Sequence, residues 1–385
     1  MKIVFNTDSL IMGGAEKLAI QYVEFLSKKF EVILLINEDN GLEKNILLDK
    51  IPNNVKYMYV TDKKIIYKIN KYRELKNKNF VYKLFYSYYL KKRRKSYQKN
   101  IVKIIKGMDY DILIDFYCKI PLSIADKRTI SWLHSSLEHV KNKNDLEKKF
   151  NKIRKVIVIT ESMKKQFMDL FPLVKNVKKL YNPFNITKIK TLAKLEDNLN
   201  VEEKKLLKKN YILSCSRLDK NKDVKTSLYA FEKIKNKYSG NFLILGEGPS
   251  KRELEELVIK LKLTNRVFFL GTQLNPYVWM KNCDIFVHSS KKEGFGMVLV
   301  EALINNCVVL ATDCPVGPRE ILDNENYGLL TPVGDVDKMA IKMLDALNNN
   351  ELRSRYKKKS QERIKIFSEE EIYNQLLDII TNYRE

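Results

Sequence analysis

The sequence has no long apolar run. Nowhere in its 385 positions do about 18 or more apolar residues follow one another, so a membrane-spanning helix is not expected. The apolar run in "MKIVFNTDSL", at the start, is too short for a secretory signal peptide and has the length of a strand. Export is therefore not expected, and the sequence predicts a cytoplasmic globular protein.

Cysteine and histidine are scarce. The five cysteines show no spacing typical of metal ligands, and most lie in or beside apolar runs such as "YILSCSRL" and "NNCVVLAT". This placement favours buried free thiols in a reducing compartment. Because only three histidines occur, any that follows a strand is a candidate for function.

Acidic residues are nearly absent from residues 63–106, which hold sixteen Lys or Arg against one acid, Glu74, in a chain of net charge +24. Tyr, Phe, Ile and Leu alternate with these cations, a pattern that suits anionic lipid headgroups. Nucleic acid is a second possible partner, and a general richness in lysine is a third explanation. The residues expected to face a membrane are Lys91, Lys92, Arg93, Arg94 and Lys95.

The length of the chain favours two domains, since one core rarely supports so many residues. Continuous apolar runs alternate with helical patterns, which indicates parallel sheets covered on both faces. We therefore predict an α/β protein with two doubly wound, Rossmann-like domains facing across a cleft, and C-terminal helices that pack back on the first. The expected strands are 2–6, 31–36, 55–60, 111–116, 129–134 and 155–160, then 211–216, 241–246, 266–271, 284–289, 307–312 and 327–332.

The same pattern suggests domain boundaries. Residues 1–183 would form an N-terminal Rossmann-like domain, and the polar, helix-prone stretch 184–209 would be a linker. Residues 210–365 would form a second Rossmann-like domain, followed by a C-terminal helix at 366–385. In such sheets ligands bind beyond the carboxyl ends of the strands, where we look for the site.

Candidate residues follow several of the expected strands. Gly13 and Gly14 precede a helix whose free N–H groups can meet a phosphate, although a plain tight turn explains them equally well. Arg217 and Lys222 follow a strand and could clamp a diphosphate, with a solvated loop as the alternative. His134 ends another strand and is either a functional group or a partly buried polar cap.

The stretch "KKEGFGMVLVEAL" carries the most specific pattern. The turn Gly294-Phe295-Gly296 precedes a helix whose N-terminus attracts phosphate. Glu301, inside that helix, can accept two hydrogen bonds from a vicinal diol such as ribose. Glu293, before the turn, can reach a group on the far side of the phosphates. One glutamate for each end of a bound nucleotide-sugar explains the spacing.

This stretch resembles the E-x7-E motif of retaining family-four (group 1) glycosyltransferases with the GT-B fold. "GGAEK", "SRLDKNKD", "LGEGP" and "YNPF" resemble that family's first loop, R-x4-K clamp, G-x-G-P turn and interdomain crossing. The family usually has Lys-Gly where this chain has Lys222-Asp223. The resemblance implies that the clamp holds the donor pyrophosphate and that Glu301 binds ribose. It also implies catalytic positions for His134 and Glu293, and a donor-side position for Gly14. The N-terminal domain, 1–183, would then bind the acceptor, and 210–365 would bind the nucleotide sugar.

By the same resemblance the activity is transfer of a hexose or N-acetylhexosamine, with retention and without metal or cofactor, from a nucleotide sugar such as a UDP-sugar. The acceptor would be a glycan or lipid-linked, as in bacterial surface polysaccharide or lipopolysaccharide synthesis, at the inner face of the membrane. No role for nucleic acid is expected. A non-enzymatic nucleotide-sugar-binding protein and a GT-B epimerase or phosphorylase remain alternatives.

Overall fold

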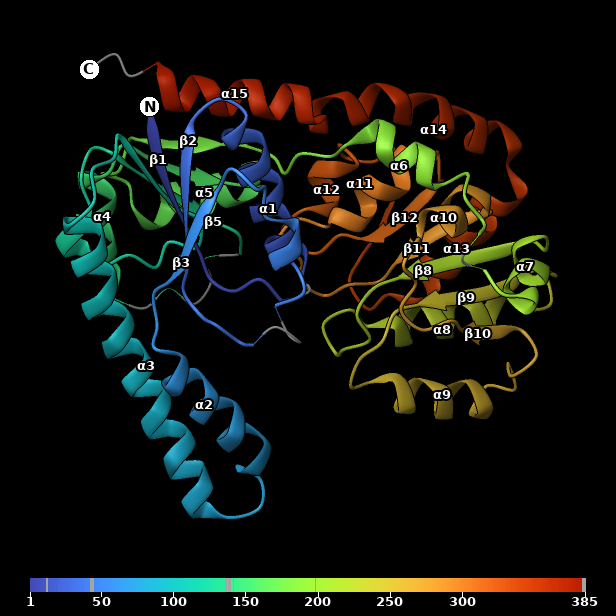
Figure 1. Ribbon diagram of the computed structural model, residues 1–385. Helices are drawn as coiled ribbons and strands as arrows, with labels where there is room; N and C mark the ends of the chain where they lie inside the picture. The colour runs from blue at the N-terminus through green and yellow to red at the C-terminus, as the bar shows by residue number, and fades with distance from the viewer. Residues whose placement is uncertain are drawn as a thin grey trace. The chain divides into compact units, whose positions relative to one another are not determined.

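The computed structural model describes residues 1–11, 13–41, 45–135, 137, 140, 142–197 and 199–382. The chain forms two compact units, each built on its own sheet (Figure 1). The first comprises Met1–Ile159, Met163–Leu180 and Gln375–Glu385, and the second comprises Thr160–Ser162 and Tyr181–Asn374. The second half of the last helix thus belongs to the N-terminal unit, as expected for C-terminal residues that return to the first domain. Residues 383–385 of the predicted C-terminal helix lie outside the described residues.

The sheet of the N-terminal unit has the order β3-β2-β1-β4-β5-β6-β7, with all neighbours parallel. Its strands are β1 Lys2–Thr7, β2 Glu31–Ile36, β3 Lys56–Tyr59, β4 Ile112–Asp115, β5 Thr129–Leu133, β6 Lys155–Val158 and β7 Val177–Lys179. Its helices are α1 Gly14–Ser27, α2 Lys63–Leu75, α3 Phe80–Lys106, α4 Lys143–Lys152 and α5 Glu161–Leu170, with short 3-10 turns η1 Leu48–Lys50 and η2 Leu122–Ile124. The order reverses between β1 and β4, which places a crevice for ligands after these strands.

Helices α2 and α3 form a hairpin that extends beyond the sheet of this unit (Figure 1). Asp62 and Asn79 cap their N-termini by accepting hydrogen bonds from the backbone N–H groups of Lys64 and Tyr82, at 2.7 and 3.0 Å. The C-terminal half of α3 packs on the sheet through Ile101 and Ile105, which are buried. The N-terminal half packs against α2, and the hairpin projects. None of the described helices is long and apolar enough to cross a bilayer.

The second unit has a parallel sheet of order β10-β9-β8-β11-β12-β13. Its strands are β8 Tyr211–Cys215, β9 Asn241–Leu245, β10 Val267–Phe269, β11 Ile285–His288, β12 Val309–Thr312 and β13 Leu329–Thr331. The helices are α6 Ile186–Leu192, α7 Val201–Leu207, α8 Val224–Ile234, α9 Lys251–Lys260, α10 Tyr277–Asn282, α11 Met297–Ile304, α12 Pro318–Ile321, α13 Val336–Asn348, α14 Asn350–Arg363 and α15 Glu369–Thr381, with η3 Ile364–Phe367 before α15. Every residue of the short strand β11 is buried, and apolar residues of α8, α9 and α13 share a core with the strands.

The twelve expected strands are all present within a residue or two of their predicted bounds. Continuous apolar runs predict such strands because a strand covered on both faces buries every side chain, and buried side chains are mostly apolar. The sequence did not predict β7, a short edge strand of sequence VKK that is only half-buried. The stretch 184–209 contains the helices α6 and α7, and both belong to the C-terminal unit.

Candidate active site

Arg217 and Lys222 lie in the loop that follows β8. The carboxylate of Asp219 accepts a hydrogen bond from Nε of Arg217 at 2.6 Å, and also the backbone N–H groups of Asn221 and Lys222 at 2.9 and 3.2 Å. Partial burial alone would raise the pKa of Asp219, but these hydrogen bonds hold it below its usual value. The loop is therefore fixed by its own aspartate, while 74% of the Arg217 side chain stays exposed and available to a phosphate.

Glycines of the turn after β9 allow that turn to support the same loop. Gly246 has φ +123°, and a Cβ atom there would lie 2.0 Å from the carbonyl oxygen of Ser216. A Cβ at Gly248 would lie 2.3 Å from the carbonyl oxygen of Leu218. Only glycine allows this approach of two backbones. The G-E-G-P turn therefore acts on the site through the loop that carries Arg217.

Lys222, Glu293 and His288 form a compact charged cluster. The ammonium of Lys222 pairs with Oε1 of Glu293, and Nε2 of His288 lies 2.6 Å from the same oxygen. The side chains of His288 and Glu293 are only 1% and 9% exposed. Burial alone would raise the pKa of Glu293, but the hydrogen bond with His288 and the charge of Lys222 lower it to about 2. Glu293 is thus ionised at any physiological pH.

Two serines join the loops that carry this cluster. The hydroxyl of Ser289 donates to the carbonyl oxygen of Asp223 at 2.9 Å, and that of Ser290 donates to the carbonyl oxygen of Asn221 at 3.2 Å. The N–H of Lys291 also donates to the carbonyl of Asn221, at 2.7 Å. The loops after β8 and β11 are neighbours because the two strands pair in the sheet. Their hydrogen bonds bring Lys222 and Glu293 together across 71 positions of sequence.

The turn Gly294-Phe295-Gly296 leads into α11. Gly296 has φ +100°, a left-handed conformation that favours glycine, and it is the N-cap of α11. Glycine has no side chain to cap the first N–H groups of this helix. The side chain of Phe295 is buried against Tyr181, Phe184 and Phe367, with ring centroids 5.9–6.5 Å apart. Phe295 was predicted to bind the donor. Because its ring is buried in this aromatic cluster, only its backbone could do so.

Glu301 lies inside α11, near the end of β8. The hydroxyl of Tyr277 donates to its Oε1 at 3.3 Å. Burial and the negative charge of Glu301 together raise the pKa of the Cys215 thiol to about 12. Glu301 therefore lies close to the last residue of β8, whose following loop carries Arg217.

Gly14 and His134 belong to the N-terminal unit. Gly14 is the first residue of α1, and a Cβ atom there would meet nothing within 4 Å. The His134 ring packs against Phe116, Tyr117 and Trp132, with its centroid 4.3 Å from that of Phe116. Burial lowers the pKa of His134 to about 4. The imidazole is therefore neutral at physiological pH.

The lowered pKa of His134 predicts a pH-dependent stability. In the unfolded chain this histidine gains a proton near pH 6.5, whereas in the folded chain it stays neutral down to about pH 4. The unfolded state binds more protons between these values, so the free energy of unfolding should fall as the pH falls. We expect about 2 kcal/mol of loss between pH 6.5 and 5 from this residue. Urea denaturation of wild type and His134→Gln measures it, and equal pH slopes in both would contradict the assignment.

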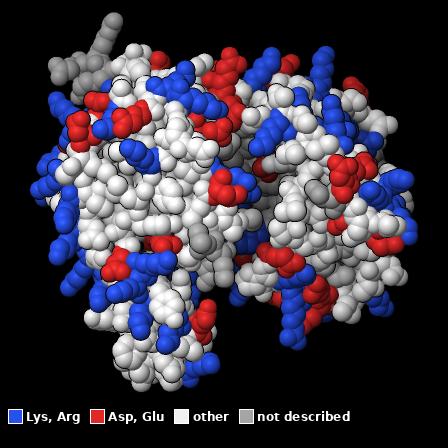
Figure 2. Space-filling view, in the orientation of Figure 1, with Lys and Arg blue, Asp and Glu red and all other residues white. Residues whose placement is uncertain are grey.

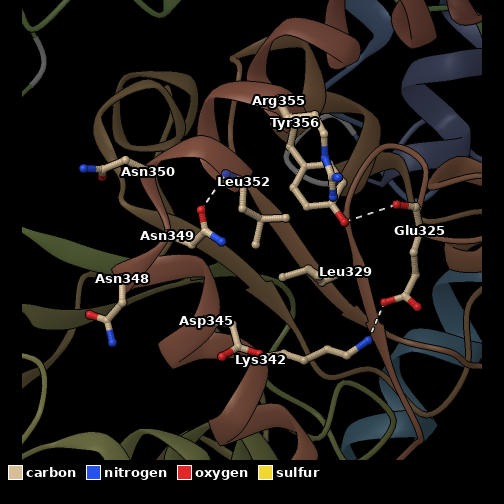
Figure 3. Close-up of a pocket in the computed structure, with 10 residues that line it drawn as sticks. All are labelled: Glu325, Leu329, Lys342, Asp345, Asn348, Asn349, Asn350, Leu352, Arg355 and Tyr356. Atoms are coloured by element: carbon tan, nitrogen blue, oxygen red, sulfur yellow. Dashed lines mark hydrogen bonds and ion pairs between the residues drawn. The ribbon is translucent and has the colours of Figure 1, made fainter.

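A depression of about 870 Å³ lies at the opposite edge of the C-terminal sheet (Figure 3). Its lining includes Leu329, which begins β13, and the ends of α13 and α14 that meet there. Lys342 pairs with Glu325, and the hydroxyl of Tyr356 donates to the carbonyl oxygen of Glu325 at 3.2 Å. Because ligands of doubly wound sheets bind at the carboxyl edge, this depression is not the candidate site.

The sequence analysis missed His288. It ends β11 within "DIFVHS", and the motif that drew attention begins five residues later, at Glu293. The signal was available in the sequence. His134 was chosen because it is one of only three histidines and follows an expected strand, and His288 meets the same criterion.

Comparisons with known proteins relate the chain to glycosyltransferases. Residues 196–363 match the model of the family described as "Glycosyl transferases group 1". The chain is 36% identical over 203 residues to the N-acetylgalactosamine-N,N'-diacetylbacillosaminyl-diphospho-undecaprenol 4-alpha-N-acetylgalactosaminyltransferase of Campylobacter jejuni, with 51% of this chain and 55% of that protein covered. It is 32% identical over 249 residues to an uncharacterized glycosyltransferase of Methanocaldococcus jannaschii, with 56% and 61% covered. The chain thus spans less than two thirds of these relatives.

Among solved structures, HepE of Anabaena in complex with UDP and glucose has the same fold, with a TM-score of 0.71, 20% identity and 99% of each chain covered. The fold is therefore that of the GT-B glycosyltransferases. Residues 196–363, which make up most of the C-terminal unit, are the part of the chain that resembles the group 1 glycosyl transferases.

Proposed function

We propose that the protein is a retaining glycosyltransferase that moves a hexose or N-acetylhexosamine from a UDP-sugar to a glycan or lipid-linked acceptor. The observation that carries the proposal is the cluster of Lys222, Glu293 and His288 beside the exposed cation of Arg217, at the carboxyl edge of a parallel sheet. An ionised carboxylate paired with Lys222, in the neighbourhood of a loop that also carries Arg217 and of a helix N-terminus, suits a donor with a sugar at one end and a diphosphate at the other.

In this proposal Arg217, Lys222 and the start of α11 hold the diphosphate. Lys222 has three N–H donors, so it can keep its bond to Glu293 and still meet a phosphate oxygen. Glu301 accepts hydrogen bonds from the ribose, and Glu293, held by His288, accepts them from the donor sugar. Gly14 and the neutral His134 belong to the N-terminal unit, and their roles beside the donor and the reacting sugar stay predictions.

The reaction we propose is a front-face displacement. The bond between the anomeric carbon and the phosphate oxygen breaks, and a bond from the acceptor oxygen forms on the same face. The acceptor's proton passes to the leaving phosphate, whose negative charge Arg217 and Lys222 stabilise. Glu293 orients the sugar and supports its positive charge.

The lipid-linked acceptor is supported by the Campylobacter relative, whose name includes a diphospho-undecaprenol. The basic segment 63–106 supports a peripheral position at an anionic membrane, because Lys91, Lys92, Arg94 and Lys95 are exposed on α3. Lys and Arg atoms cover much of the projecting hairpin (Figure 2). Arg93 was predicted to face the membrane too, but it pairs with Glu38 at 2.7 Å and is only partly exposed.

Release of UDP from a panel of nucleotide sugars tests the proposal. We expect slow hydrolysis of one UDP-sugar, with turnover unchanged in excess EDTA, because Lys222, Arg217 and a helix N-terminus supply the positive charge that a metal would. Binding without UDP release would indicate a binding protein, and release of a rearranged UDP-sugar an epimerase. Complete loss of turnover in EDTA, restored by Mn²⁺ or Mg²⁺, would contradict the cation mechanism.

A further inference from the structure

Large apolar side chains are exposed together at the start of α3. Elsewhere such residues are mostly exposed singly, as is normal for a protein surface. Here five fall within nine positions, and we call them the hairpin end: Phe80 (70% exposed), Val81 (53%), Leu84 (53%), Phe85 (45%) and Tyr88 (56%). A group of this size on a projecting element indicates contact with another apolar phase.

Most of the packing inside the hairpin is made by other side chains. Its internal contacts are made by buried Ile65, Ile66 and Ile69 of α2 against Tyr86, Tyr89 and Leu90 of α3. Tyr72 stacks on Phe85 and Tyr89, with ring centroids 5.2 and 5.6 Å apart. Phe85 thus contributes to the packing, whereas the other four residues of the hairpin end remain more than half exposed.

That face continues into the basic residues. Val81, Leu84, Tyr88, Lys91 and Lys95 follow one another at steps of three or four positions, which places them on one stripe of the helix. The stripe is apolar in its first two turns and cationic in the next two. Figure 2 shows this mixture on the projecting hairpin, where uncharged surface lies beside Lys and Arg.

We propose that the hairpin end inserts its apolar side chains between the lipids of an anionic bilayer, while Lys91, Lys92, Arg94 and Lys95 contact the headgroup phosphates. Aromatic and aliphatic residues followed by lysines match the boundary between acyl chains and headgroups. A second copy of this chain is a poor partner for the hairpin end. Residues 63–106 hold sixteen cations against one acid, so the same segments of two copies would repel each other. The inference rests on the membrane-facing part of the proposed function, but its test needs no sugar donor.

A tryptophan placed at the hairpin end reports insertion directly. The two native tryptophans, Trp132 and Trp279, are fully buried, so a new exposed one is readable above them. In the full chain, Leu84→Trp should be quenched by brominated lipids in vesicles of phosphatidylcholine and phosphatidylglycerol. The matched control is Ile259→Trp, at an exposed apolar position of α9 (65% exposed), which should not be quenched.

The salt concentration distinguishes the contributions of the apolar and cationic halves of the stripe to vesicle binding. The variant Val81→Gln/Leu84→Gln/Tyr88→Gln should lose at least ten-fold in vesicle binding at about 0.5 M salt, where charges are screened. Glutamine keeps helix propensity, and circular dichroism checks the fold. Lys91→Gln/Lys92→Gln/Arg94→Gln/Lys95→Gln should instead lose the extra binding seen at about 0.05 M salt and keep the salt-resistant part.

Three results would overturn the inference. Quenching of the Leu84→Trp variant no stronger than that of the Ile259→Trp control would exclude insertion, and so would vesicle binding that the triple glutamine variant of the hairpin end leaves unchanged. A dimer that this glutamine variant abolishes, without lipid quenching, would assign the hairpin end to a second copy. UDP release is measured on the same samples, so failure of the transferase proposal is seen separately from failure of insertion.

Discussion

Replacing Glu293 by glutamine is expected to lower turnover by about a hundred- to thousand-fold while UDP affinity changes little. Glutamine keeps the size of the side chain but removes the charge that supports the reacting sugar. It also leaves the ammonium of Lys222 and the buried ring of His288 without their anionic partner. Steady-state kinetics with the active UDP-sugar, together with UDP titration calorimetry, measure the two effects separately.

Glu325 offers a matched control for this change. Like Glu293, it is a glutamate of the C-terminal unit that pairs with a lysine, here Lys342. Its pKa is also lowered, because a hydrogen bond from the backbone N–H of Leu330 and the ammonium of Lys342 outweigh the effect of partial burial. Because it lies at the opposite edge of the sheet, Glu325→Gln should leave turnover unchanged. Equal losses in both variants would point to a general effect on stability and would contradict the role of Glu293.

Removing either cation of the clamp is expected to weaken UDP binding. Arg217→Ala and Lys222→Ala each delete a charge-assisted contact to phosphate of about 1.5–3 kcal/mol, which corresponds to roughly a ten- to hundred-fold loss of affinity. Lys220→Ala is the control, because Lys220 is an exposed cation of the same loop that we assign no role. Calorimetry with UDP gives the affinities. The clamp would be refuted by UDP affinity that neither Arg217→Ala nor Lys222→Ala changes.

The positions of the candidate residues could be predicted because they follow strands, and continuous apolar runs in the sequence indicate where the strands lie. Glu293, Glu301 and the Gly-Phe-Gly turn are close in sequence, so their spacing along one turn and one helix can be read directly. The contact between Lys222 and Glu293 could not be predicted from the sequence. It depends on the pairing of β8 with β11 and on the hydrogen bonds of Ser289 and Ser290.

The basic segment shows the same division. Its composition predicts a helical, cationic region, and that region is present as α2 and α3. The sequence did not reveal that Arg93 turns toward Glu38 while Leu84 and Tyr88 turn outward, since both depend on how α3 packs on α2 and the sheet. Phe295 illustrates the reverse case, because a residue inside a binding motif contributes its ring to the core.

The stereochemistry of transfer tests the central claim most directly. With the UDP-sugar that the hydrolysis panel selects, an α-linked donor and an alcohol acceptor, proton NMR follows the anomeric signal of the first product formed. A front-face displacement at Glu293, with Arg217 and Lys222 on the leaving diphosphate, predicts an α-linked product. A β-linked product, or sugar release with no transfer to any acceptor, would contradict the account.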